Sequence, residues 1–469
     1  MTSRRIGLVC PYSLAVPGGV QNHVLGLAGH LTARGHHVEV FAPGSVEPAR
    51  LAAFGLRGDQ LTDAGRTVGI PYNGSVAPVN FGPLSLLRVH RWLRRGRFDL
   101  VHVHEPLTPS VAGWALVAAR VPVVATFHTA TPRSRTMGVA GALLRRTVDR
   151  IDAGIAVSAT ARQVVVQHLG RDARILPNGF RRADFGPRPA ARRPGGPRIA
   201  FLGRLDEPRK GLEVLLGALP RLRTAHPGLE VVVAGQGHRP LPAWVQAPGR
   251  IDDPARAELL GSVDLFVAPH VARESFGIVL VEAMASGAAV VASDLPPFVD
   301  LLSGPERLGY QFAAGDADAL AEAVLLALDE DRSELVRRAR HATRRYDWTR
   351  VGAEVEAVYQ DVLTGPRSPG PWTGIDPATV AEARWRLRLA ARRGVGAPQA
   401  AALRLAARAL LDQAAGAVDA EQPDRTPAAD AADASAGDGR GSAPTPGRGR
   451  RAVRGHRSRR VSTAAGRTR

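Results

Sequence analysis

Cysteine, lysine and long apolar runs are nearly absent from this sequence of 469 residues. Cys10 is the single cysteine, which excludes a disulfide framework and indicates a reducing compartment. The best apolar stretch, residues 111–127, is interrupted by an arginine and a proline, so no stretch reaches membrane-spanning length. The apolar run at residues 6–10 is too short for a signal peptide and predicts a first strand. We therefore expect a cytoplasmic protein.

The near absence of lysine makes Lys210, the only one, informative. The formal net charge is +19, and arginine supplies almost all of the positive charge. Such a balance indicates acidic partners: phosphorylated substrates, an anionic membrane or nucleic acid. A composition that favours arginine has kept one compact ammonium group, which suggests that a planar guanidinium does not serve at this position. We therefore predict that Lys210 has a functional role at a binding or catalytic site and is not simply an exposed charge.

Residues 273–287, Arg-Glu-Ser-Phe-Gly-Ile-Val-Leu-Val-Glu-Ala-Met-Ala-Ser-Gly, predict a loop and a helix between two short buried strands. The helix opens at Gly277, with Glu274 in the loop at a strand's carboxyl end and Glu282 inside the helix. In an open α/β sheet, ligands bind outside the carboxyl ends of the strands, and a helix N-terminus attracts phosphate. Two acids at this spacing also occur by chance. The string as a whole favours a site for a polar, phosphorylated ligand.

A second loop, residues 203–211, follows the predicted strand 198–202. It places Arg204, Arg209 and Lys210 at a strand's carboxyl end, where a diphosphate requires positive charge. Fixed cations of this kind stabilise the negative charge that develops on a departing diphosphate. The loop therefore predicts a diphosphate site.

The N-terminal part predicts a strand, a glycine turn at Gly18-Gly19 and a helix that begins near Val20. The turn does not match Gly-x-Gly-x-x-Gly, so a nicotinamide site is not indicated. Glycine here permits close approach of a ligand to the backbone. A tight turn without a ligand is the alternative.

Two further strands are predicted to deliver polar residues into a cleft. The first, residues 98–104, contains a His-x-His pattern, which is weak evidence for a metal without a further clustered ligand, and His102 is better explained as a core residue. The second, residues 121–127, delivers His128 and Thr129 at its carboxyl end, where ligand-facing residues lie.

Residues 81–97 predict a strongly cationic helix with Trp92 among its apolar residues. A basic amphipathic helix with an aromatic residue can lie on an anionic membrane surface. A solvated helix face in an arginine-rich protein is the alternative. The basic residues of this helix are Arg88, His90, Arg91, Arg94, Arg95 and Arg97.

Taken together, these motifs resemble the retaining glycosyltransferases of GT-B architecture in family 4, in particular the actinobacterial phosphatidyl-myo-inositol mannosyltransferases that add the first mannose. The resemblance covers residues 6 to about 363. The Ile-Pro-Tyr-Asn-Gly-Ser turn and the Asp-Glu-Pro-Arg-Lys loop are its most specific parts. The other motifs that carry it are Pro-Gly-Gly-Val-Gln, His-Val-His-Glu-Pro, Ala-Thr-Phe-His-Thr and Glu-Ser-Phe-Gly-Ile-Val-Leu-Val-Glu-Ala-Met.

The resemblance implies an α/β fold with two Rossmann-like domains that face a cleft, followed by a C-terminal extension. Within the first domain, residues 43–70 show only weak signals of secondary structure and predict a variable loop region. The expected parts of the chain are an acceptor-side domain at 1–179, a linker at 180–197, a nucleotide-sugar domain at 198–346, a helix crossing back at 347–363, an Arg/Ala-rich helical extension at 364–415 and a disordered basic tail at 416–469.

The resemblance also implies a donor, GDP-mannose, and roles for individual residues. Catalytic roles fall to His128, Glu274, Arg204 and Lys210. The diphosphate is expected to bind Arg204 and Lys210, the ribose Glu282, and the mannose Glu274 and His128. The full set of expected donor contacts is Gly18, Gly19, Arg204, Arg209, Lys210, Glu274, Phe276, Gly277, Ile278 and Glu282.

The acceptor implied by the resemblance is phosphatidylinositol, on the cytoplasmic face of the plasma membrane, to which the enzyme is peripherally bound. No cofactor or bound metal is obligatory, and a divalent cation would at most stimulate. The expected acceptor contacts are Tyr12, Gln21, Tyr72, Asn73, Ser75 and Thr129, and the expected membrane contacts are Arg88, Arg91, Trp92, Arg94 and Arg95.

The chain departs from the family pattern at Ala15, where an acid is expected, and this puts the acceptor-side contacts in question. Three alternatives stay open: a related transferase with another sugar and acceptor, a GT-B nucleotide-sugar epimerase or hydrolase, and a nucleic-acid-binding protein. The last rests on charge alone, without a recognition motif, and no specific nucleic acid is expected.

Overall fold

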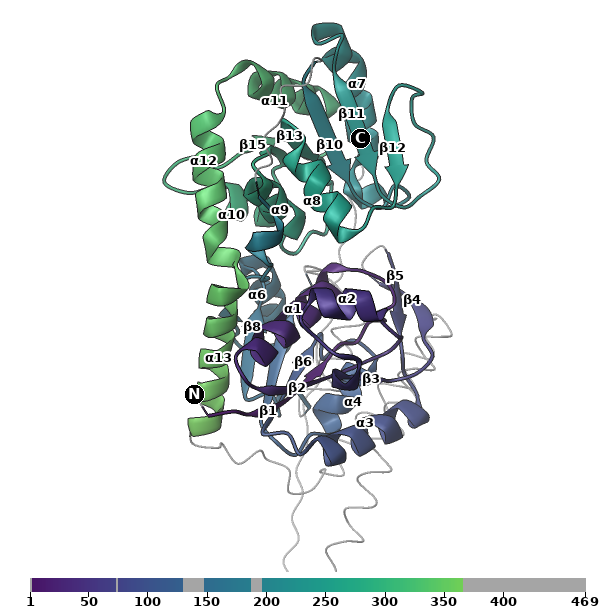
Figure 1. The fold of residues 1–469 in the computed structure, drawn as a ribbon, viewed down its shortest axis with the longest axis vertical. Coiled ribbons are helices and arrows are strands. Elements are labelled where there is room, and N and C mark those ends of the chain that lie inside the picture. The colour runs from purple at the N-terminus through teal and green to yellow at the C-terminus, as the bar shows by residue number, and fades with distance from the viewer. Residues whose placement is uncertain (1, 73–74, 130–146, 187–195, 366–469) are drawn as a thin grey trace, which may run out of the picture. The chain divides into compact units, whose positions relative to one another are not determined.

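The computed structural model describes residues 2–72, 75–129, 147–186 and 196–365. These residues form two parallel sheets and a small antiparallel hairpin, with helices packed on the sheets (Figure 1). Within these ranges, the helices are too short or too polar to cross a membrane. Of the predicted extension and tail at 364–469, all residues from 366 onwards lie outside the described ranges, as do residues 130–146.

The first sheet has seven parallel strands in the order β3-β2-β1-β6-β7-β8-β9. The strand order reverses between β1 and β6, and the crevice beside such a reversal is where α/β sheets bind ligands. Parallel strands are buried on both faces, which explains their continuous apolar sequences. The strands are β1 (Arg5–Val9), β2 (His37–Ala42), β3 (Leu61–Asp63), β6 (Leu100–His104), β7 (Val123–Phe127), β8 (Ala153–Ala156) and β9 (Arg174–Ile175).

Helices cover both faces of the first sheet. Ile6 and Leu8 of β1 belong to one buried cluster with α1 (Gly19–Ala33) and α13 (Trp348–Thr364). Val9, on the opposite face, belongs to another with α3 (Pro83–Gly96) and α4 (Val111–Ala118). A Cβ on Gly26 of α1 would lie 2.4 Å from Trp348 Nε1, so glycine allows α13 to pack closely on α1. The other helices among the described residues of this part are α2 (Pro48–Ala53), η1 (Gly58–Gln60), α6 (Ala159–Leu169) and η2 (Arg182–Asp184).

The second sheet has six parallel strands in the order β12-β11-β10-β13-β14-β15, and its order reverses between β10 and β13. Its strands are β10 (Arg198–Leu202), β11 (Glu230–Ala234), β12 (Gln246–Gly249), β13 (Leu265–Ala268), β14 (Ala289–Ser293) and β15 (Tyr310–Phe312). Its helices are η3 (Pro208–Lys210), α7 (Leu212–Ala225), α8 (Asp253–Gly261), α9 (Ile278–Ser286), α10 (Pro296–Leu302), α11 (Ala317–Asp329), α12 (Ser333–Ala342) and η4 (Thr343–Tyr346).

Two sequence-based expectations need correction. The region 43–70 is not only loop: it contains α2, η1, the edge strand β3 and β4 (Val68–Tyr72), elements too short to give a periodic signal. The first residues of the predicted linker are packed structure, because Phe180 and Phe185 are buried and Phe180 forms a parallel bridge with Asp347. Residues 187–195 of that linker lie outside the described ranges.

Candidate functional site

The loops after β10 and β13 bring together the charged residues that the sequence marked in the second half. These two strands are neighbours at the reversal of strand order. The loop after β10 ends at Gly211, which has φ +72°, and a Cβ there would lie 1.6 Å from the Pro269 carbonyl oxygen. Only glycine allows the two loops to approach this closely. Gly211 thus allows both loops to pack against each other at the carboxyl edge of the sheet.

Lys210 joins the two loops through its ammonium group. Its Nζ lies 2.9 Å from His270 Nε2 and 3.1 Å from Glu274 Oε2. Burial alone would raise the pKa of Glu274, but Lys210, His270 and Arg209 lower it to about 2, so the carboxylate is ionised. Burial and then Lys210 lower the pKa of His270 to about 3, which leaves the imidazole neutral and able to accept from the ammonium.

Two guanidinium groups lie on the same loop as Lys210. Glu207, nearly buried, pairs with Arg204 at 3.0 Å and with Arg209 at 2.8 Å. Arg209 also lies 3.9 Å from Glu274. The cations are therefore held in place by carboxylates of the protein. Such a set of oriented charges can bind a diphosphate without reorganising.

Helix α9 starts beside this cluster, at Gly277 with φ +92°, where a Cβ would lie 2.6 Å from Phe298. Phe276 is buried, and its ring meets that of Tyr346 edge-on. Ile278, the first residue of the helix, is half-buried. The expected donor contacts at this position thus lie where the helix N-terminus begins.

Glu282, expected at the ribose, is paired within the protein. Its Oε2 lies 3.1 Å from Nε of Arg256, a residue of α8, and its side chain is almost fully buried. Burial raises the pKa of Glu282, and the charge of Arg256 opposes this. Arg256 and His270 were not predicted from the sequence, because nothing in their local pattern separates them from the many other arginines and histidines.

In the first sheet, His128 and Thr129 directly follow β7, as the sequence predicts. Both are buried, and Thr129 Oγ1 donates to a carboxylate oxygen of Glu105 at 2.9 Å. His102 is fully buried and bonded to Tyr359 and Thr126, which confirms that it is a core residue.

His128 belongs to a cluster of buried imidazoles that the sequence did not reveal. His23 of α1, His104 of β6 and His128 each place a nitrogen within 4.8 Å of the others, a set that could hold a metal ion. His104 Nδ1 and His128 Nε2 already share a hydrogen bond of 3.1 Å. Burial, and then the neighbouring histidines, lower the pKa of His104 and His128, so these rings are neutral. The expectation that His-x-His lacks further clustered ligands was wrong, because His23 is distant in sequence.

The remaining predicted site residues of the first half, the donor contacts Gly18 and Gly19 and the acceptor contacts, lie around the start of α1 and on the hairpin. Gly18 caps α1, Gly19 begins it, and Gln21 Nε2 donates to the Ser13 carbonyl at 3.3 Å. Tyr12, buried, forms a bridge with Val79 of β5. In the hairpin of β4 with β5 (Ser75–Val79), Tyr72 pairs with Ser75, and Asn73 lies outside the described residues.

Helix α3 presents a different surface from the one expected. Trp92 is only 4% exposed, its ring packs on Phe41 and Phe98, and its Nε1 donates to Glu39 at 3.1 Å. Its inclusion among the membrane contacts was wrong, because the ring fills the core beneath the helix. Leu84 and Leu87 are instead 69% and 65% exposed. The outer face of α3 combines these leucines with Arg88, His90, Arg91, Arg94 and Arg95, all exposed.

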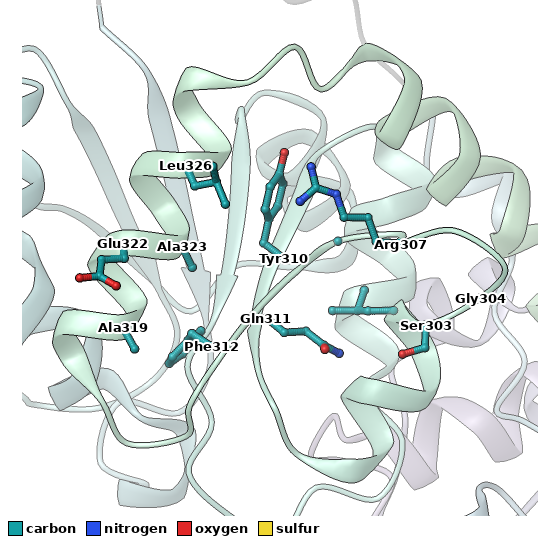
Figure 2. A pocket seen from close by; sticks show the side chains of 12 residues that line it. Ser303, Gly304, Arg307, Tyr310, Gln311, Phe312, Ala319, Glu322, Ala323 and Leu326 are labelled. Carbon is teal, nitrogen blue, oxygen red and sulfur yellow. The ribbon is translucent and has the colours of Figure 1, made fainter.

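A hollow of about 690 Å³ opens beside the edge strand β15, lined by residues of α10, β15, α11 and the segment between α10 and β15 (Figure 2). The Arg307 guanidinium lies 4.7 Å from the centre of the Tyr310 ring at its rim. None of the predicted site residues lines this hollow. It offers no cluster of cations, so it does not replace the loops after β10 and β13 as the candidate site.

Comparison with known proteins agrees with this geometry. Residues 17–183 match the model of Glycosyltransferase Family 4, and residues 196–330 match that of Glycosyl transferases group 1. The Anabaena protein HepE, crystallised with UDP and glucose, has a similar fold, with a TM-score of 0.61 at 19% identity over 76% of this chain and 100% of that one. The fold is GT-B.

Curated relatives share much more of the sequence. The chain is 47% identical to the phosphatidyl-myo-inositol mannosyltransferase of Propionibacterium freudenreichii, over 76% of this chain and 94% of the relative. It is 44% identical to the enzyme of that name from Mycolicibacterium smegmatis, over the same shares. The chain is thus a glycosyltransferase of family 4 and belongs to the family of the phosphatidyl-myo-inositol mannosyltransferases.

Proposed function

We propose that this enzyme transfers mannose from GDP-mannose to phosphatidyl-myo-inositol with retention of configuration, at the cytoplasmic face of the plasma membrane. The observation that carries the proposal is the 47% identity to a phosphatidyl-myo-inositol mannosyltransferase along 94% of that relative. The charged loops after β10 and β13 supply the chemistry that such a donor needs.

The diphosphate of the donor is assigned to Arg204, Arg209 and Lys210. All three lie on one loop at the carboxyl end of β10, and carboxylates of the protein orient them. When the bond between the sugar and the diphosphate breaks, negative charge gathers on the departing phosphate oxygen. Cations that are already fixed stabilise that charge more than mobile ones, because they do not need to reorganise. This arrangement supports transfer without an obligatory metal ion.

The sugar and the acceptor hydroxyl are assigned to Glu274, His128 and Thr129. Retention follows if the acceptor hydroxyl attacks C1 from the face that the diphosphate leaves. The new C1–O bond forms as the old one breaks, and the hydroxyl proton passes to the departing phosphate oxygen. No covalent nucleophile is then needed. His128, held neutral by burial, can donate or accept a hydrogen bond at the sugar without carrying charge.

The lipid surface is assigned to α3. Its exposed arginines suit anionic head groups, and Leu84 and Leu87 can enter the boundary between head groups and acyl chains. Figure 1 shows α3 lying along the outside of the first sheet. A peripheral helix of this kind supports an acceptor that stays in the membrane.

The test is transfer of radiolabelled mannose from GDP-mannose to vesicles that contain phosphatidylinositol. Wild type should give lipid-linked label, and Glu274→Ala and Lys210→Ala should abolish it. The matched control is Arg221→Ala, which removes an exposed guanidinium from α7, paired with Glu322, and should transfer normally. No lipid-linked label from wild type, with turnover of a different nucleotide sugar, would overturn the substrates while leaving the fold intact.

A further inference from the structure

We propose that Glu105 is a positioning residue of this enzyme, whose carboxylate sets the orientation of His128 and Thr129 towards sugar and acceptor. The inference rests on the proposed function, because Glu105 acts through two residues that were assigned there to the substrates. Glu105 directly follows β6, the strand that neighbours β7 in the sheet. It therefore lies beside the segment that it is proposed to hold.

The two oxygens of the Glu105 carboxylate have different partners on that segment. Oε1 accepts the backbone N–H of His128, and Oε2 accepts the hydroxyl of Thr129 at 2.9 Å. The backbone of Glu105 is tied as well, since its N–H donates to the Thr126 carbonyl at 2.8 Å and its carbonyl accepts from Thr108 at 3.0 Å. One residue thus links the end of β6 to the first two residues after β7.

Position 105 is unfavourable for glutamate in both its backbone conformation and its burial. Its φ is +49°, in the left-handed region where a side chain is strained, and the residue is 4% exposed. Among the described residues, no ion pair involves this carboxyl group. Glycine would relieve the backbone, and an apolar residue would relieve the burial of the carboxyl group. Neither would supply two acceptors, so the hydrogen bonds explain the choice.

The imidazole of His128 has its own constraint. His104 Nδ1 meets His128 Nε2 at 3.1 Å, so β6 supplies a partner for the ring while Glu105 supplies one for the backbone. Without Glu105, the Thr129 hydroxyl would lose an acceptor and the His128 backbone would lose its anchor. The residues that Glu105 holds follow β7 of the first sheet, whereas the diphosphate is assigned to the loop after β10 of the second, so binding of the diphosphate should not depend on Glu105.

The experiment compares Glu105→Gln and Glu105→Asp with wild type in mannosyl transfer. Glutamine keeps the shape but loses the charge, and its NH2 group can only donate, so it either reverses the hydrogen bond with the Thr129 hydroxyl or faces the His128 N–H with a second donor. We expect kcat to fall by about 10- to 100-fold and the KM for phosphatidylinositol to rise, because misplaced reacting groups have effects of this size. The affinity for GDP, measured by calorimetry, should change less than about twofold. Aspartate, which keeps both acceptors, should recover part of kcat.

The matched control is Glu322→Gln, which alters an exposed carboxylate of the second sheet's helices and should leave all parameters unchanged. Unchanged kcat in Glu105→Gln, or loss of GDP binding in step with activity, would overturn the proposal. If the variants do not fold, NMR of the wild-type protein tests the proposal through the backbone amide of His128. Its hydrogen should exchange slowly with solvent and resonate downfield, and rapid exchange would overturn the proposal. Failure of wild type to label phosphatidylinositol would refute the proposed function instead, and the same amide measurement would still decide on Glu105.

Discussion

Lys210 combines two properties that rarely occur together on a surface loop. It is the only lysine of an arginine-rich chain, and its ammonium lies between a neutral imidazole and an ionised carboxylate of the neighbouring loop. A compact group with three donors can meet both partners and a phosphate oxygen. A guanidinium is longer and planar and has no equivalent position between His270 and Glu274.

We therefore predict that Lys210→Arg lowers kcat/KM on the order of 100- to 1,000-fold although the charge is kept, because the cation no longer sits at the departing phosphate. Lys210→Met should do the same and also lower the free energy of unfolding by about 3 kcal/mol, since Glu274 is left buried without its main partner. Steady-state kinetics and urea unfolding measure both.

The control for that prediction is the double variant Lys210→Met, Glu274→Gln. Removing the buried charge together with its partner should restore most of the stability without restoring activity. Activity of Lys210→Arg within about threefold of wild type would refute the argument, because any cation would then serve.

The sequence predicts those site residues that stand out by composition or by a long motif, and it does not reveal those whose local sequence is ordinary. Lys210 was singled out by composition, and Glu274 by its place in a long motif. His270, Arg256 and Glu105 were missed because their roles come from contacts between elements that are separate in the sequence, which a linear pattern does not contain.

Helix α3 is the element in which the expected and observed surfaces differ most. Both contain the arginines, but the apolar contribution comes from Leu84 and Leu87 instead of Trp92. Helical spacing predicts which residues share a face, but not which face the core takes. Trp92 also has a donor that finds Glu39, which favours the buried side.

We predict that Leu84→Ser with Leu87→Ser weakens binding to phosphatidylinositol vesicles about tenfold or more and leaves the unfolding midpoint unchanged, because both side chains are exposed. Flotation with vesicles measures binding. Leu326→Ser, at an exposed leucine of α11, is the control and should bind as wild type does. Equal binding by the double variant would exclude the leucines from the membrane contact.

For the whole molecule, the order of elements was largely predictable, since apolar strands and glycine-ended helices alternate along the chain. Short elements in residues 43–70 were not, because three to six residues give no period. The buried histidines were also unpredictable as a group. They come from separate strands and a helix, and only the assembled sheet brings them together.

These histidines make the stability of the fold depend on pH. Burial lowers the pKa of His23 and His102 to about 3, burial and Lys210 do the same for His270, and the pKa values of His104 and His128 fall well below 6.5. Between these values and 6.5, the unfolded chain binds more protons than the folded one. The stability is therefore present above pH 6.5 and lost as the pH falls.

We predict that the free energy of unfolding drops by roughly 4 kcal/mol between pH 6.5 and 5.5. Burial raises the pKa of Glu105 to about 7, so protonation of this one group in the folded state offsets part of the loss. Urea unfolding at several pH values measures how steeply the free energy of unfolding changes with pH, which gives the number of protons taken up on unfolding. His102→Gln should lower that number by about one. His238→Gln, at an exposed histidine, is the control. A constant midpoint from pH 7.5 to 5.5 would refute the prediction.

The contact between Lys210 and Glu274 has a consequence for how the donor is recognised. In the proposed donor complex, a phosphate oxygen would accept the third N–H of the Lys210 ammonium while His270 and Glu274 keep the other two. The Glu274 carboxylate would then stay ionised and would be held at the sugar by the same cation that contacts the phosphate. Free mannose brings no phosphate to that third donor, so we expect it to bind more weakly than the activated sugar.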